Sequence, residues 1–145
     1  MERLDYRGRF SEGWAALGAF AKTADEAGLG HELLELIKLR ASQINGCANC
    51  VNLHANRLRE AGVTEERIQN VVVWWESPCF DARETAALAW TEAVTLVASS
   101  RVPDDVYERA RSQFDERDLT ALTFAICAIN THNRLAVAFR RVPGS

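Results

Sequence analysis

Two cysteines and a histidine stand close together in the sequence, at a spacing that suits thiol chemistry. Cys47 and Cys50 are separated by two residues, and His54 follows Cys50 by four. An α-helix has about 3.6 residues per turn, so residues three or four apart share one face of it. If a helix begins at Cys47, all three side chains therefore lie on one face. Asn45 favours this start as an N-cap residue, and Gly46 interrupts the preceding pattern.

A cysteine pair at the start of a helix favours nucleophilic and redox chemistry. The free backbone N–H groups and the positive end of the helix dipole stabilise a thiolate, and in such settings a cysteine pKa of ~8.5 falls to about 3.5–7.5. The thiolate attacks, and the second thiol can trap the oxidised sulfur as a disulfide. His54 is one turn from Cys50 and two from Cys47, so its reach favours Cys50. Glu35, from the preceding segment, can orient His54 or pass its proton onward.

Two other interpretations of the cysteine pair remain open. A zinc site needs four ligands, but Cys47, Cys50 and His54 supply three, and no second pair stands at the spacing usual for zinc fingers. The cysteines could also be inert core residues, since free cysteine is among the most buried residue types. Cys79 and Cys127 lie far away in the sequence, and spacing alone pairs them with nothing. A redox pair is the interpretation that the pattern favours.

The pattern E-x11-C-x-x-C-x3-H, from Glu35 to His54, resembles the signature of the alkylhydroperoxidase D-like (AhpD-like) branch of the carboxymuconolactone decarboxylase superfamily. The resemblance extends from about the helix before Glu35 to the C-terminus. The segments that carry it are LRASQINGCANCVNLH, AGVTEERI, ESPCFDARETAALAWTEAVTLV and INTHNRLAVAFRRVPG. In two places the chain differs from the family's pattern: Ala48-Asn49 stands where the best-known peroxidases have a histidine, and Trp75 replaces a usual arginine.

The resemblance implies a compact all-α, multi-helix fold, a single domain over residues 1–145, a homo-oligomer, and thiol-dependent reduction of hydroperoxides. By position, Cys50 would be the attacking thiol and Cys47 the resolving thiol, while His54 and Glu35 would form a proton relay. The partners would be a small hydroperoxide and a dithiol or thiol-protein reductant, with no cofactor and no metal. The alternatives are a carboxymuconolactone decarboxylase-like enzyme, whose chemistry does not need a CxxC, and a non-catalytic redox-sensing or zinc-binding helical module.

Composition narrows the class of protein. With 17 basic and 20 acidic residues, the formal net charge is −3, so no basic field is available for nucleic acid. No apolar run approaches the ~18 residues that span a bilayer, and MERLDYRGRF lacks the apolar stretch of a signal peptide. We therefore expect no membrane or nucleic-acid partner and a cytoplasmic location, where thiols are kept reduced and a CxxC pair is typically catalytic.

Hydrophobic periodicity and capping residues predict helices throughout the chain, and no segment alternates in the way of a strand. Residues 1–10 are expected to form an extended arm. The expected helices cover residues 11–27 (capped by Ser11), 31–44, 47–61, a segment from Thr64 to Trp75, 81–97, 103–114 and 116–139.

Three features within these helices lead to further expectations. Glu35 lies near the apolar side of its helix, where a carboxylate is usually a boundary residue in contact with solvent. The run from Val71 to Trp75 is apolar nearly all round, so it should be buried or covered by a partner subunit. His132 is expected to be a hydrogen-bonded interior or interface residue.

Overall fold

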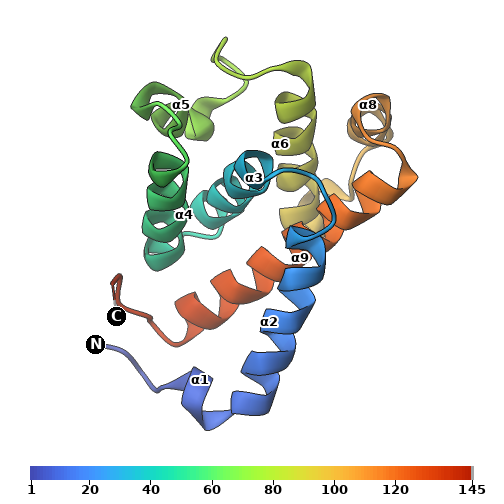
Figure 1. Ribbon diagram of the computed structural model, residues 1–145. Helices are drawn as coiled ribbons and strands as arrows, with labels where there is room; N and C mark the ends of the chain where they lie inside the picture. The colour runs from blue at the N-terminus through green and yellow to red at the C-terminus, as the bar shows by residue number, and fades with distance from the viewer. Residues whose placement is uncertain (145) are drawn as a thin grey trace.

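The structure, a computed structural model, describes residues 1–144, and this part of the chain contains helices but no strand (Figure 1). The all-α fold expected from the sequence is confirmed. The elements are α1 (Tyr6–Arg9), α2 (Ser11–Asp25), α3 (His31–Ile44), α4 (Ala48–Glu60), α5 (Glu65–Asn70), the 3₁₀ helix η1 (Val71–Val73), α6 (Ala82–Thr95), α7 (Val97–Ser100), α8 (Asp104–Gln113) and α9 (Glu116–Ala138).

Helix α3 lies in the middle of the bundle and packs against α4, α6 and α9 (Figure 1). Its side chains divide between two hydrophobic clusters. Leu34 and Ile37 belong to one cluster with residues of α2, α6, α8 and α9, whereas Leu36 and Leu39 join a second cluster with α4, α5, η1 and α6. Because α3 is packed on both sides, its polar residues Glu35, Lys38 and Ser42 are buried among neighbouring side chains.

Most helix ends follow the expected capping residues. Thr64 and Asp115 each accept a hydrogen bond from the backbone N–H three residues on, and Asp81 with Glu84 forms a complete capping box. The N-terminal arm differs from the expectation. It contains the short helix α1, and Phe10 occupies the N-cap position of α2, so Ser11 is the first residue of that helix and not its cap.

The apolar run from Val71 to Trp75 does not continue an α-helix. Of the two alternatives expected for it, burial within this chain holds for only part of the run, and cover by a partner subunit stays a prediction. Helix α5 ends at Asn70, and the chain tightens into η1. In a 3₁₀ helix residues three apart lie over one another, so Val71 and Trp74 both face the core. The side chains between and after them remain accessible: Val72 is 46%, Val73 38% and Trp75 56% exposed.

None of the helices within residues 1–144 is both long enough and apolar enough to cross a membrane.

Candidate functional site

The turn between α3 and α4 places the first cysteine at a helix start. Gly46 has φ +67°, and the N–H groups of Gly46 and Cys47 donate to the carbonyls of Gln43 and Ser42, the two bonds of a Schellman motif. Asn45 is thus the C-cap of α3, and the expectation that it caps the next helix is wrong. Cys47 itself is the N-cap of α4, because the Schellman motif ends one helix at the residue where the next begins.

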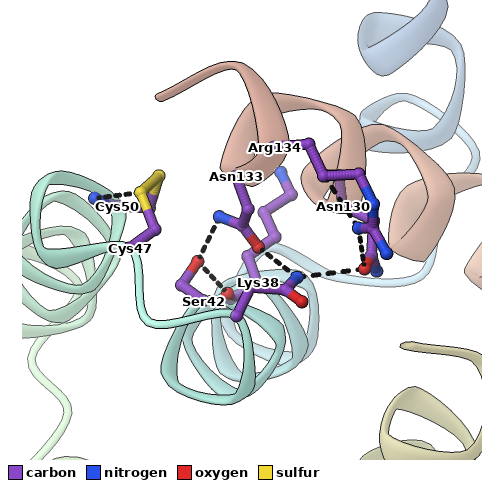
Figure 2. The surroundings of a disulfide bond; sticks show 8 residues. Lys38, Ser42, Cys47, Cys50, Asn130, Asn133 and Arg134 are labelled. Carbon is purple, nitrogen blue, oxygen red and sulfur yellow. Dashed lines mark hydrogen bonds between the residues drawn. A yellow bond between two sulfur atoms is a disulfide. The ribbon is translucent and has the colours of Figure 1, made fainter. Parts of the chain in front are cut away.

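Cys47 and Cys50 form a disulfide, shown in Figure 2, with their Cα atoms 5.3 Å apart. The Sγ atom of Cys47 also accepts a hydrogen bond from the backbone N–H of Cys50 at 3.3 Å. Both residues are buried, and Ala136 of α9 packs on them. Cys79 and Cys127 are free thiols, the first partly buried and the second exposed. The expected pairing within the CxxC motif is therefore the pairing found.

Glu35 and His54 meet in the interface between α3 and α4. Their side chains are 2% and 5% exposed, and Nδ1 of His54 lies 2.6 Å from Oε2 of Glu35. The expectation of a solvent-contacting boundary position for Glu35 is wrong, because α4 packs over this side of α3. The free-energy cost of burying this carboxylate is offset by His54 and by two cations. Its Oε1 lies 3.7 Å from Nζ of Lys38 and 3.7 Å from Nη1 of Arg57.

The two groups titrate in the direction that favours an ionised Glu35 and a neutral His54. Burial by itself raises the pKa of Glu35, but the hydrogen bond from His54 and the charges of His54, Lys38 and Arg57 outweigh it and hold that pKa below its ordinary value. Burial lowers the pKa of His54, and the opposing effect of Glu35 does not restore it. An ionised carboxylate only accepts hydrogen bonds, so Nδ1 of His54 is the donor and Nε2 keeps a free lone pair.

A chain of charges extends from this pair toward α2. Nζ of Lys38, itself largely buried, lies 2.6 Å from Oδ1 of Asp25. Sequence reasoning missed Lys38, Arg57 and Asp25. Lys38 stands three residues after Glu35 and Arg57 three after His54, so helical spacing carried a signal for both. The signal was absent for Asp25, which arrives from another helix.

A cavity of about 710 Å³ opens beside this pair. Cys50 and His54 both line it, whereas Cys47 does not, so only one of the two cysteines borders the cavity. Asn49, one of the two residues between the cysteines, also lines the cavity. The remaining walls come from α1, α2, α3, α4, α9 and the C-terminal segment. They include Tyr6, Arg7, Trp14, Ala21, Asp25, Lys38, Asn52, Leu53, Asn56, Arg57, Ala125, Ala128, Ile129, His132, Ala136, Arg141, Pro143 and Gly144.

His132 lies on the α9 wall of the same cavity. Its ring packs edge-on against that of Trp14, with 5.3 Å between the ring centroids. Burial, followed by the positive charges of the site, lowers its pKa. Within residues 1–144 its imidazole makes no hydrogen bond, so the expectation of a hydrogen-bonded histidine is wrong in that respect. The buried polar side chain at this point of α9 is that of the next residue, Asn133.

A polar network holds the cysteine turn against α9 (Figure 2). Nδ2 of Asn45 donates to the side-chain oxygens of Asn130 and Asn133, both at 3.0 Å. Asn133 in turn donates to Oγ of Ser42 at 3.0 Å. Asn133 and Ser42 are fully buried, so the network links the end of α3, next to Cys47, to the interior of α9.

Within the described residues, no group of three or more His, Cys, Asp or Glu side chains is arranged to hold a metal ion. The zinc interpretation of the CxxC motif thus finds no ligand set there. The candidate ligands that lie closest together already have partners: Cys47 is bonded to Cys50 in a disulfide, and His54 is paired with Glu35.

Comparisons with known proteins agree with this geometry. The model of the carboxymuconolactone decarboxylase family matches residues 9–93. The uncharacterised protein YdfG of Bacillus subtilis is 36% identical over 137 residues, which cover 94% of this chain and 93% of that protein. A crystal structure from Agrobacterium tumefaciens, of a protein of unknown function described as a candidate antioxidant defence protein AhpD, superposes with a TM-score of 0.97. It is 41% identical and covers 100% of this chain and 99% of that one.

A shorter stretch of the chain has a further relative. Alkyl hydroperoxide reductase AhpD of a Methylobacterium species is 49% identical over 45 residues, which are 31% of this chain and 26% of that protein. The match to the family model spans more than half of the chain, and the relatives cover the cysteine motif and its surroundings. This chain belongs to the carboxymuconolactone decarboxylase family and is an AhpD-like protein within it.

Proposed function

We propose that this protein is a peroxiredoxin-type thiol peroxidase that reduces organic hydroperoxides with Cys50 and Cys47. One observation carries the proposal: a single cavity is lined by Cys50 and by His54, and Glu35 holds the imidazole from behind through a 2.6 Å hydrogen bond. A cysteine nucleophile, a base one helical turn away and a group that orients the base are the parts that nucleophilic catalysis needs. The described relatives named AhpD support the same reaction class.

The first step starts from the reduced pair. Nε2 of His54 accepts the proton of the Cys50 thiol, and Glu35 stabilises the resulting imidazolium. The Cys50 thiolate attacks the terminal oxygen of the hydroperoxide ROOH, so that a sulfur–oxygen bond forms as the oxygen–oxygen bond breaks. The leaving alkoxide takes the proton back from His54 and departs as the alcohol ROH. Cys50 is left as a sulfenic acid, oxidised by two electrons.

Cys47 completes the cycle as the resolving thiol. Its sulfur attacks the sulfur of the Cys50 sulfenic acid, water leaves with the Cys47 proton, and the disulfide forms. This step would yield the same Cys47–Cys50 disulfide that the structure contains. An external dithiol or thiol protein then reduces it by exchange, for which Cys50 is the reachable sulfur because it lines the cavity and Cys47 does not.

Hydroperoxide consumption with a dithiol reductant tests the proposal. We expect the wild type to consume cumene hydroperoxide and Cys50→Ser to lose that activity. The thiolate is the nucleophile, and serine has no thiol from which to form one. Cys79→Ser is the matched control, because Cys79 is a free thiol outside the cavity, and it should stay within about twofold of the wild type. A wild type that consumes no hydroperoxide, or a Cys50→Ser variant that keeps its rate, contradicts the proposal.

The disulfide supports a second candidate, a general disulfide oxidoreductase whose substrate is a protein disulfide and not a peroxide. The two functions share the cysteine pair and differ in the oxidant. Reduced protein mixed with an equimolar hydroperoxide, and separately with a disulfide such as oxidised glutathione, distinguishes them. Under the peroxidase proposal the hydroperoxide oxidises the pair faster.

We further propose a homo-oligomer in which the exposed side chains of Val72, Val73 and Trp75 contribute to the contact. Adjacent apolar side chains left open to solvent commonly mark interfaces. Light scattering at micromolar concentration tests this: a mass above that of the 16.2 kDa chain is expected, and Trp75→Glu should reduce it. A wild-type monomer would rule the assembly out.

A further inference from the structure

The cavity beside Cys50 is far larger than hydrogen peroxide requires. Its volume of about 710 Å³ lies within the range of pockets that bind drug-sized ligands, roughly 300–1,000 Å³, whereas a water molecule occupies about 30 Å³ of liquid. Trp14, Leu53 and Ile129 contribute apolar wall, together with several alanines of α2 and α9. The lining therefore suits an organic body of several carbon atoms.

The charged groups on the wall are predominantly cationic, although the whole chain is acidic. Arg7, Lys38, Arg57 and Arg141 line the cavity against one carboxylate, that of Asp25. Three of these cations have a carboxylate nearby. Lys38 has Asp25 at 2.6 Å, Arg57 has Glu35 at 3.7 Å, and Arg141 has Glu2 at 3.4 Å.

Arg7 is the exception. Its guanidinium lies 6.0 Å from the centre of the Trp14 ring, a cation–π arrangement that holds it at the cavity wall. The residue is half-buried, yet among residues 1–144 it makes no ion pair and its side chain donates no hydrogen bond. A half-buried guanidinium with no acceptor among these residues has its N–H groups available to an anion, best of all to a carboxylate bound by two parallel N–H groups.

We propose that the cavity binds an organic hydroperoxide that carries a carboxylate, with the carboxylate on Arg7 and the hydroperoxide group at Cys50. The inference rests on the peroxidase function proposed above and names its substrate class. In Figure 1, α1, which carries Arg7, and α4, which carries Cys50, lie on different sides of the C-terminal segment. The substrate would thus be bound at two separate places, its carboxylate at Arg7 of α1 and its hydroperoxide group at Cys50 of α4.

The reaction keeps the balance of the general peroxidase step. The Cys50 thiolate takes the terminal oxygen of the hydroperoxide, the oxygen–oxygen bond breaks, and the product is the hydroxy acid with its carboxylate unchanged. Cys47 expels water from the sulfenic acid and forms the disulfide, and an external dithiol supplies the two electrons that reset the pair. The carboxylate serves only to bind the substrate and takes no part in the oxygen transfer to Cys50.

A pair of matched oxidants tests the inference. Cumene hydroperoxide and its ring 4-carboxylate share the same reacting group and differ in charge. Pre-reduced protein, freed of excess reductant, is mixed with each, and disulfide formation is followed in a single turnover. We expect the wild type to react about tenfold faster or more with the carboxylate at low salt, and the preference to shrink as salt is raised.

Variants of Arg7 test where the carboxylate binds. Arg7→Gln should lower the rate with the carboxylate about tenfold and change the rate with cumene hydroperoxide less than about twofold, because it removes the charge and leaves the thiol site intact. Arg7→Lys should retain part of the preference. Arg9→Gln is the matched control, since Arg9 is exposed on the same helix and does not line the cavity. A loss in Arg9→Gln equal to that in Arg7→Gln would overturn the assignment.

A binding measurement distinguishes failure of the anion site from failure of the peroxidase function. Titration of the disulfide form with 4-isopropylbenzoate, which cannot react, should show binding by the wild type and about tenfold weaker binding by Arg7→Gln. If the protein reduces neither hydroperoxide but binds this acid through Arg7, the peroxidase function fails and the anion site stands. If it reduces both hydroperoxides at equal rates and Arg7→Gln changes neither the rates nor binding, the peroxidase stands and the anion site is overturned.

Discussion

Two histidines face the same cavity from different helices, and they differ in what lies behind them. His54 on α4 has a carboxylate partner, Glu35, at 2.6 Å, whereas His132 on α9 packs against the ring of Trp14. Burial is the largest influence on both, and it lowers the pKa of each. Burial thus favours the neutral form of both imidazoles. Only a hydrogen-bonded carboxylate also sets which nitrogen carries the proton and where the other one points.

The walls that hold these histidines differ in the same way. The α4 wall presents Asn49, Asn52 and Asn56 as well as Cys50 and His54, so polar side chains form much of it. The α9 wall is built mainly from alanines and Ile129, which shape the cavity without offering hydrogen bonds from their side chains. We infer that the α4 wall supplies the chemistry and the α9 wall supplies the shape.

Replacing each histidine tests this difference most strongly. We expect His54→Gln to lose about 10²–10⁴-fold in hydroperoxide reduction, because the general base is removed. His132→Gln, the matched variant on the other wall, should stay within about threefold, since no partner orients its imidazole. The measurement is the second-order rate of disulfide formation in pre-reduced protein. Equal losses in the two variants would show that both imidazoles act on the reaction.

Replacing the partner of His54 should have a smaller effect in the same direction. Glu35→Gln keeps a group of the same shape but removes the charge that stabilises the imidazolium, and a carboxylate that orients a functional histidine is commonly worth about 10–100-fold. The thiol alkylation rate against pH, together with the peroxidase rate, measures it. The double variant with His54→Gln should be little worse than His54→Gln alone, because both residues serve one relay. Fully multiplicative losses would separate the two roles.

Asn133 has the buried partners that its neighbour His132 lacks, so its replacement should affect stability. Asn133→Ala removes two hydrogen bonds at the cysteine turn, the one from Nδ2 of Asn45 and the one to Oγ of Ser42, and a typical hydrogen bond contributes about 0.5–1.5 kcal/mol. Urea unfolding measures the loss. Thr131→Ala, at an exposed position of α9 whose hydroxyl bonds only its own helix, should lose less than about 0.5 kcal/mol. A stable Asn133→Ala variant would mean that the turn holds without α9.

A lower pH should reduce the free energy of unfolding through both histidines. We expect this effect to be smaller than those of the substitutions above. The pKa values of the two histidines are lowered in the folded chain, so below the ordinary value of 6.5 the unfolded chain binds protons that the folded chain does not. Their stabilisation is complete above about pH 6.5 and is lost as the pH falls toward their folded values. Glu35, also lowered, adds a loss in the same direction below its ordinary value of 4.5.

The free energy of unfolding at pH 7.5 and pH 5.5 tests this. We expect a decrease on the order of 1 kcal/mol, since one pKa unit corresponds to about 1.4 kcal/mol. His132→Gln should reduce the decrease, and the control His31→Gln, at an exposed position, should leave it unchanged. A protein more stable at pH 5.5 would mean that these histidines gain protons on folding, contrary to the directions found here.

The sequence by itself determined the features that depend on local spacing. The distance of three between Cys47 and Cys50 predicted the disulfide, and the distance of four to His54 predicted a histidine near Cys50. Thr64, Asp81 and Asp115 predicted where helices begin, because a cap needs only the backbone of the next turn. The family signature added Glu35 to the same group of residues.

Only the tertiary structure decided what the helices bring together across the chain. Burial of Glu35 follows from the packing of α4 on α3, and Asp25 reaches Lys38 from α2, whose position no local pattern specifies. The tightening of Val71–Val73 into a 3₁₀ helix likewise depended on which side chains the core accepted, since the apolar run itself favoured no face. The cavity with Arg7 and His132 on its walls exists because α1, α2, α4 and α9 converge there, and that convergence is a property of packing between helices distant in sequence.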